Sequence, residues 1–172
     1  MKIFINAGHG GADPGAVSKN GIKEKDITRN VAEFLCSMLI AKGYDIEFFQ
    51  QKKSVNEVVE KERISKSSLF ISLHCNAAVN KDANGVECLY YPGSGTGKAV
   101  SEILCENISE YLELKNRGVK TRRDLAVLNG TVAPAVLVEL AFLSNGNEEK
   151  LLVEEPYSFA NAIVKGIEEW KK

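Results

Sequence analysis

Both histidines of this chain lie at or just beyond the ends of short apolar runs that predict β-strands. His9 comes shortly after Ile3–Ile5, in a segment rich in glycine, and His74 follows Leu69–Leu73. Ligand sites of open α/β sheets form just beyond the carboxyl ends of strands, where such side chains are free to bind. The positions of the two imidazoles therefore predict a shared metal site.

Two carboxylates supply the rest of the expected chemistry. Glu139 ends the apolar run Ala135–Val138, where a carboxylate is costly to bury unless it is paired or near a cation. Glu24 lies at the start of a predicted helix, and Asp26 competes with it on pattern alone. Two imidazoles and one carboxylate leave zinc an open position for water, and a second carboxylate can serve as base. This combination predicts a hydrolase.

The elements that must position these residues alternate along the chain. Apolar periodicity predicts strands over 2–6, 44–49, 69–74, 85–91, 125–128 and 135–140, and helices over 25–42, 55–67, 96–112 and 157–171. The glycine-rich stretch 7–23 predicts a long functional loop. We therefore expect one α/β domain over 1–172, with a twisted, mixed, mostly parallel sheet of about six strands and helices on both faces.

Composition limits the classes of partner. The chain has 172 residues and a net charge of −1, so no global positive field favours a nucleic acid or an anionic membrane. The basic residues between Lys115 and Arg123 predict a solvated loop, with contact to an anionic polymer as the alternative. We expect a monomer. No apolar stretch reaches the ~20 residues that span a bilayer, and the start is too short for a signal-peptide core. We expect either a protein held inside the cell until its release or the mature domain of an exported one.

Other chemical motifs fail on detail. The segment Gly93–Ala99 resembles a phosphate loop, but Pro92 stands where the first glycine is required and Ala99 replaces the hydroxyl that binds magnesium. Neither an H-E-x-x-H helix nor a G-x-S-x-G turn is present. The four cysteines are widely spread and predict free, mostly buried thiols. Cys75 adjoins His74, but neighbouring side chains of a strand point to opposite faces, which disfavours a chemical role.

Four segments together resemble the zinc-dependent N-acetylmuramoyl-L-alanine amidases. They are Gly8–Ala16, Glu24–Asp26, Ser72–Ala77 and Pro134–Asn145, and the likeness covers essentially the whole chain in order. The resemblance implies a twisted mixed sheet, one zinc ion bound by His9, Glu24 and His74, and a catalytic Glu139. It favours Glu24 over Asp26, which spacing alone leaves open.

The implied substrate is peptidoglycan, cut at the amide between N-acetylmuramic acid and the L-alanine of the stem peptide, which places the action at the bacterial cell wall. The chain departs from the family pattern at Asn6-Ala7, where Asp-Pro is usual, at Cys75, where alanine is common, and at Asn129, where many relatives carry a basic residue. Two other interpretations remain open at this point. One is a zinc peptidase that acts within the stem peptide, and the other is a wall-binding module without catalysis.

Overall fold

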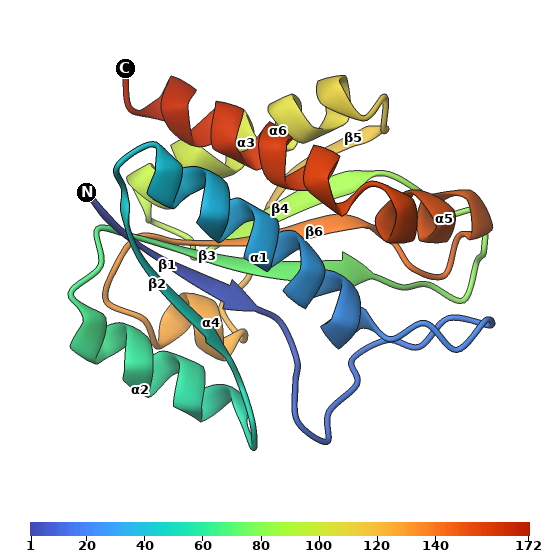
Figure 1. Cartoon of the computed structure of the whole chain (residues 1–172), viewed down its shortest axis with the longest axis horizontal. Helices are drawn as coiled ribbons and strands as arrows, with labels where there is room; N and C mark the ends of the chain where they lie inside the picture. The colour runs from blue at the N-terminus through green and yellow to red at the C-terminus, as the bar shows by residue number, and fades with distance from the viewer.

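A single six-stranded sheet forms the centre of the computed structural model, which describes all residues from 1 to 172 (Figure 1). Its strand order is β2-β1-β3-β6-β4-β5. The strands are β1 (Lys2–Ala7), β2 (Asp45–Gln50), β3 (Leu69–Asn76), β4 (Val86–Tyr90), β5 (Asn116–Thr121) and β6 (Ala135–Phe142). The predicted mixed, mostly parallel α/β sheet is confirmed.

Strand direction brings the functional ends together. Strands β2, β1, β3 and β6 run parallel, while β4 pairs antiparallel with β6 and parallel with β5. The carboxyl ends of β1, β3 and β6 therefore lie at one edge of the sheet, beside the amino end of β4 (Figure 1). This is the edge at which open α/β sheets bind their ligands.

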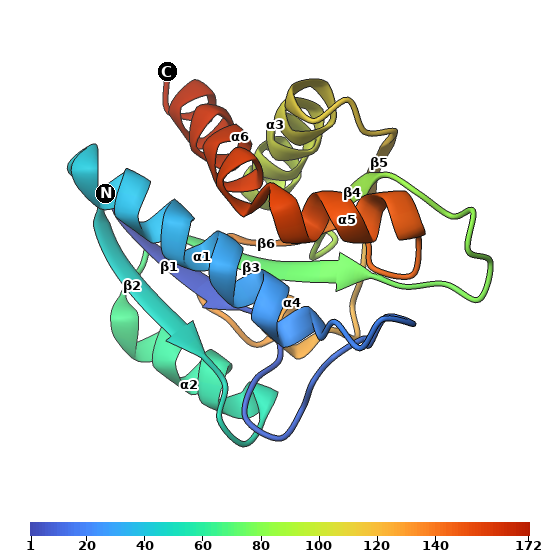
Figure 2. The same cartoon turned by 45° about the vertical axis from the view of Figure 1, so that its right-hand side comes forward.

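Helices cover the sheet from both sides. Figure 2 shows α1, α3 and α6 on one face of the sheet and α2 on the other. The helices are α1 (Glu24–Ala41), α2 (Val55–Ser65), α3 (Gly95–Tyr111), α4 (Ala126–Asn129), α5 (Gly146–Glu154) and α6 (Pro156–Trp170). No helix combines the length and the apolar character that crossing a bilayer requires.

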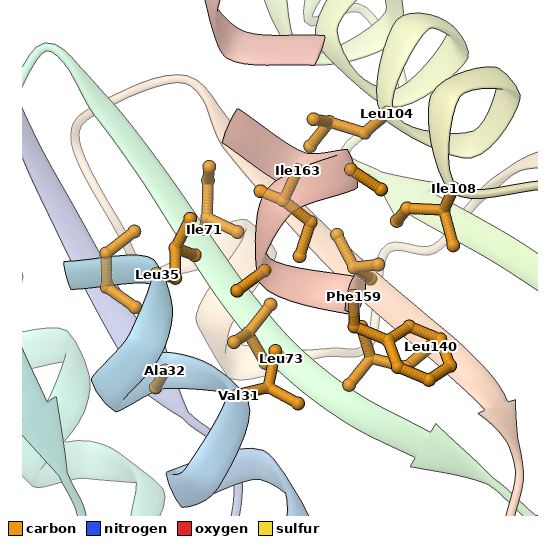
Figure 3. Close-up of a cluster of buried hydrophobic side chains, with 14 of the residues drawn as sticks. Val31, Ala32, Leu35, Ile71, Leu73, Leu104, Ile108, Leu140, Phe159 and Ile163 are labelled. Carbon is orange, nitrogen blue, oxygen red and sulfur yellow. The ribbon is translucent and has the colours of Figure 1, made fainter. Parts of the chain in front are cut away.

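The larger hydrophobic core lies between the sheet and helices α1, α3 and α6 (Figure 3). It contains 31 buried residues, so it supplies most of the apolar burial that stabilises the fold. Ile71 and Leu73 of β3 enter it alongside Leu35 of α1 and Phe159 of α6. Cys75 belongs to the same core, as the alternation of side chains predicts.

The opposite face of the sheet is covered only in part. A smaller core of nine buried residues, which includes Phe4, Phe70 and Leu137, packs beneath α2 and α4. Two residues further along the same strands, the side chains on this face become polar, with Ser72 after Phe70 and Glu139 after Leu137. The sheet thus presents an apolar, covered part and a polar part near the carboxyl ends of β3 and β6.

Two local predictions were wrong, and one helix was missed. Residues 125–128 form no strand, because 126–129 make the short helix α4, which buries Val127 and Leu128 against the smaller core. The basic stretch that predicted a loop contains the edge strand β5, whose polar sequence carries little apolar alternation. Helix α5 was not predicted, although the Asn145 side chain caps it by accepting hydrogen bonds from the N–H groups of Asn147 and Glu148.

Glu62 provides a test of how α2 is fixed to the sheet. Its carboxylate, 1% exposed, accepts hydrogen bonds from the backbone N–H groups of Val132 (2.8 Å) and Ala133 (3.0 Å), just before β6. We expect Glu62→Ala to lower the free energy of unfolding by about 2–3 kcal/mol, because it leaves these donors unpaired. Urea unfolding measures the loss. Glu60→Ala, an exposed site on the same helix, is the control, and an equal loss in both variants would contradict the assigned role of Glu62.

Candidate metal centre

Three predicted ligands meet at the carboxyl edge of the sheet. His9 lies in the loop after β1, Glu24 is the first residue of α1, and His74 lies near the end of β3. Glu24 Oε1 is 3.2 Å from His9 Nε2 and 3.1 Å from His74 Nδ1. The ligand atoms of all three residues lie within 4.8 Å of one another, a spacing that one metal ion could bridge. The competing acid Asp26 is exposed and lies outside this group.

The glycine-rich loop permits this approach. His9 itself adopts a left-handed backbone conformation with φ of 62°, which is uncommon for a residue other than glycine. A Cβ atom at Gly8 would lie 2.4 Å from His74 Cε1, and one at Gly15 would lie 2.5 Å from Glu24 Oε2. Both positions therefore require glycine for close packing around the ligands.

Glu24 is held rigidly as an ionised carboxylate. Its Oε2 accepts a hydrogen bond from the N–H of Ala16 (2.8 Å), and its Oε1 accepts one from the N–H of Cys75 (2.9 Å). Burial alone would raise the pKa of Glu24, but the hydrogen bonds to His74 and His9 hold it well below its ordinary value. A fixed negative charge therefore sits between the two imidazoles.

Asp13 orients the ring of His9. Its Oδ2 lies 2.9 Å from His9 Nδ1 and accepts a hydrogen bond from Gln51 Nε2 at 3.1 Å. Burial would lower the pKa of His9, but the hydrogen bonds to Glu24 and Asp13 outweigh it and raise this pKa to about 9. The carboxylates that favour a proton on His9 equally favour a metal cation beside its Nε2. Sequence reasoning missed this role of Asp13, although its position four residues after His9 in the same loop was available as a signal.

These residues fit a zinc ion on chemical grounds. Two imidazole nitrogens and one carboxylate oxygen converge from three separate segments of the chain. Each imidazole has a partner for its other ring nitrogen, Asp13 for His9 and the Ser72 hydroxyl for His74. Outer partners of this kind fix the orientation of metal-binding histidines, and a set of three ligands leaves a position for water or substrate.

Glu139 stands beside this group on the neighbouring strand. It pairs with His74 in the register of β3 and β6, so both side chains lie on the same face of the sheet. Its Oε2 atom is buried and has no hydrogen-bond partner. Burial raises the pKa of Glu139 to about 7, and the charges of Glu24 and Glu87 act in the same direction. A carboxylate with such a pKa can both accept and return a proton near neutral pH.

A cleft of about 300 Å³ opens next to the candidate ligands. Its lining includes His9 and His74 and, from the segment that leads into α4, Asp124 and Leu125. Asp124 also accepts two hydrogen bonds from the guanidinium group of Arg122, at 2.8 and 2.6 Å. The cleft therefore gives access to the two imidazoles of the candidate site.

Comparison with known proteins agrees with this arrangement. The sequence pattern of the N-acetylmuramoyl-L-alanine amidase family matches residues 3–169 of this chain. The YqiI protein of Bacillus subtilis is 34% identical over 98% of this chain and 84% of its own length. The N-acetylmuramoyl-L-alanine amidase CwlM of Bacillus licheniformis is 33% identical over 96% of this chain, which spans 65% of CwlM.

A solved structure shares the whole fold. The structure of the N-acetylmuramoyl-L-alanine amidase AmiC2 of Nostoc punctiforme superposes with a TM-score of 0.91, at 27% identity, and the match covers 99% of this chain and 97% of AmiC2. Fold and site together define an α/β protein with a candidate metal centre at the carboxyl edge of its sheet. The chain belongs to the N-acetylmuramoyl-L-alanine amidase family.

Proposed function

We propose that this chain is a zinc-dependent N-acetylmuramoyl-L-alanine amidase. It hydrolyses the amide that joins the lactyl group of N-acetylmuramic acid to the L-alanine of the peptidoglycan stem peptide. The observation that carries this proposal is the convergence of His9, Glu24 and His74 beside Glu139, whose Oε2 is buried and unpartnered. Family membership and the names of CwlM and AmiC2 support the choice of bond.

The roles of the residues follow from their positions. His9, Glu24 and His74 would hold one zinc ion, which when bound lowers the pKa of water and polarises a carbonyl oxygen. Glu139 accepts a proton from the attacking water, whose oxygen adds to the amide carbonyl carbon. The carbon–nitrogen bond then breaks, and Glu139 returns the proton to the departing nitrogen of L-alanine. This sequence needs no covalent intermediate, so neither Ser72 nor the buried Cys75 is required as a nucleophile.

The chemistry of Glu139 favours catalysis over binding alone. A module that only bound the cell wall would have no need of a carboxylate with a buried, unpartnered oxygen beside its metal ligands. Isolated buried carboxylates are costly, and such costs concentrate where a protein does chemistry. The substrate places the action of the enzyme at the bacterial cell wall, and we propose that it acts as a monomer on peptidoglycan alone, without nucleic acid or membrane as a partner.

Mass spectrometry of the products tests this function. We expect purified sacculi treated with the zinc-loaded protein to release intact stem peptides with a free L-alanine amine, leaving glycan strands without peptide. A chelator should abolish the release, and added zinc should restore it. Shortened peptides with part of the stem still on the glycan would instead identify a peptidase. Binding to sacculi without any release, in a protein that carries zinc, would identify a wall-binding module.

A further inference from the structure

A buried polar chain links His74 to the strand on its other side. Ser72, with no exposed surface, lies two residues before His74 on β3, and its Oγ is 3.1 Å from His74 Nε2. The side chain of Asn6, 2% exposed, lies 2.8 Å from the same Oγ. Asn6 and Ser72 are register partners on β1 and β3, so both point to the face that carries the candidate metal centre.

Only one orientation of the Asn6 amide satisfies its surroundings. If the amide nitrogen faced Ser72, the amide oxygen would face only the carbonyl oxygens of Phe49 and Ala7, three acceptors with no donor. In the other orientation the nitrogen donates to Phe49 O at 3.1 Å and Ala7 O at 3.2 Å. The amide oxygen then accepts from Ser72 Oγ at 2.8 Å. The hydrogen-bond network therefore assigns the second orientation.

This orientation determines the proton positions as far as His74. Because the Ser72 hydroxyl gives its only proton to Asn6, its lone pairs face His74 Nε2. Nε2 must then carry the proton of the imidazole and donate it to Ser72 Oγ. In the neutral ring this leaves a lone pair on Nδ1, the nitrogen that lies 3.1 Å from Glu24 Oε1. A hydrogen bond between these two atoms needs a second proton on the ring, and a metal cation can take the place of that proton.

We propose that Asn6 and Ser72 are positioning residues that fix the tautomer and the orientation of His74 for metal binding. This assignment rests on the proposed zinc-dependent function. His9 obtains the same result by a different route, since the carboxylate of Asp13 accepts from its Nδ1. The two imidazoles thus bind through different nitrogens, Nε2 of His9 and Nδ1 of His74. The ring of His9 is oriented by the charged carboxylate of Asp13 at a partly exposed position. The ring of His74 is oriented by the neutral, buried pair of Ser72 and Asn6.

Zinc affinity separates this role from simple strand pairing. We expect Ser72→Ala to raise the zinc dissociation constant by about 10–100-fold, the usual cost of losing an outer partner of a metal-binding histidine. Competition with a chromogenic chelator measures this constant without any assay of activity. Ser72→Thr keeps the hydroxyl and should restore most of the affinity. Ser101→Ala is the matched control, because Ser101 is equally buried, its hydroxyl has no partner and it lies on α3.

A second variant and a spectroscopic readout cover the case in which Ser72→Ala folds poorly. Asn6→Ala should also weaken zinc binding, since the Ser72 hydroxyl then loses its acceptor. The chain has two histidines, so NMR of the zinc-loaded protein can assign each ring nitrogen directly. We expect a protected N–H signal at His74 Nε2 in the native protein, and its loss in Ser72→Ala.

The outcomes are distinct. Native zinc affinity in both Ser72→Ala and Asn6→Ala would overturn the positioning role, as would zinc-bound His74 with its proton on Nδ1. Equal weakening in Ser101→Ala would also overturn it, because the loss would then follow from any buried serine. A native protein that binds no zinc would instead refute the proposed function, and that failure shows before any variant is made.

Discussion

Glu139→Gln is expected to retain one zinc ion per chain, while its turnover rate falls by at least about 100-fold. Glutamine keeps the size of the side chain, so the strand pairing with His74 is preserved. It cannot accept a proton from water, and general acid–base catalysis of this kind contributes ~10²–10⁴-fold to the rate. Release of stem peptides from sacculi and zinc content by elemental analysis measure the two properties on the same sample.

A neighbouring carboxylate provides the control for this variant. Glu87 on β4 is the register partner of Glu139 and is itself buried. Its Oε2, however, already accepts hydrogen bonds from Lys120 at 2.6 Å and from Arg117 at 2.9 Å. We expect Glu87→Gln to keep most of the turnover, because the Glu139 carboxylate stays in place and burial, rather than the charge of Glu87, is the main cause of its raised pKa. If Glu139→Gln kept as much activity as Glu87→Gln, the proton would have to be carried by another group.

The general position of the site could be predicted from the sequence because it depends on strand ends. His9 and His74 each follow an apolar run, and parallel strands bring such ends to one edge of a sheet. The choice of Glu24 over Asp26 could not be made from spacing, since both residues lie in the first turn of α1. It depends on how the glycine-rich loop packs around His9 and Glu24, and on the sequence side only the resemblance to a known family supports it.

The residues that support the ligands were beyond sequence reasoning for a related reason. The contact between Asn6 and Ser72 depends on the register of β1 against β3, which no local pattern encodes. The errors in secondary structure have the same origin. Four residues at 126–129 form a helix because Val127 and Leu128 fill the smaller core, and a short apolar run does not by itself distinguish strand from helix. Strand β5 is stabilised by pairing with β4 along the edge of the sheet, although its own sequence is mostly polar.

Loss of either histidine is expected to have the largest effect on the metal. We expect His9→Ala and His74→Ala each to weaken zinc binding by more than the ~10–100-fold that an outer partner contributes, and to abolish turnover with it. Each variant leaves Glu24 with one imidazole in place of two, so the remaining set has too few ligands for a stable catalytic zinc site. Asp26→Ala is the control, because this acid lies two residues from Glu24 but outside the ligand group, and it should bind zinc as the native protein does.

Thermal unfolding gives a second measure of the lost zinc binding, and this measure does not depend on catalysis. A ligand that binds only the folded chain stabilises it by RT ln(1 + [L]/Kd), about 2.7 kcal/mol when the free zinc is 100 times the dissociation constant. Zinc should therefore raise the melting temperature of the native protein and of Asp26→Ala, and leave that of both histidine variants nearly unchanged. Because His9 and His74 belong to segments far apart in the sequence, an equal loss of the zinc effect in both variants is expected only if they share one ion. A normal zinc-induced shift in either variant would show that its imidazole is not a ligand.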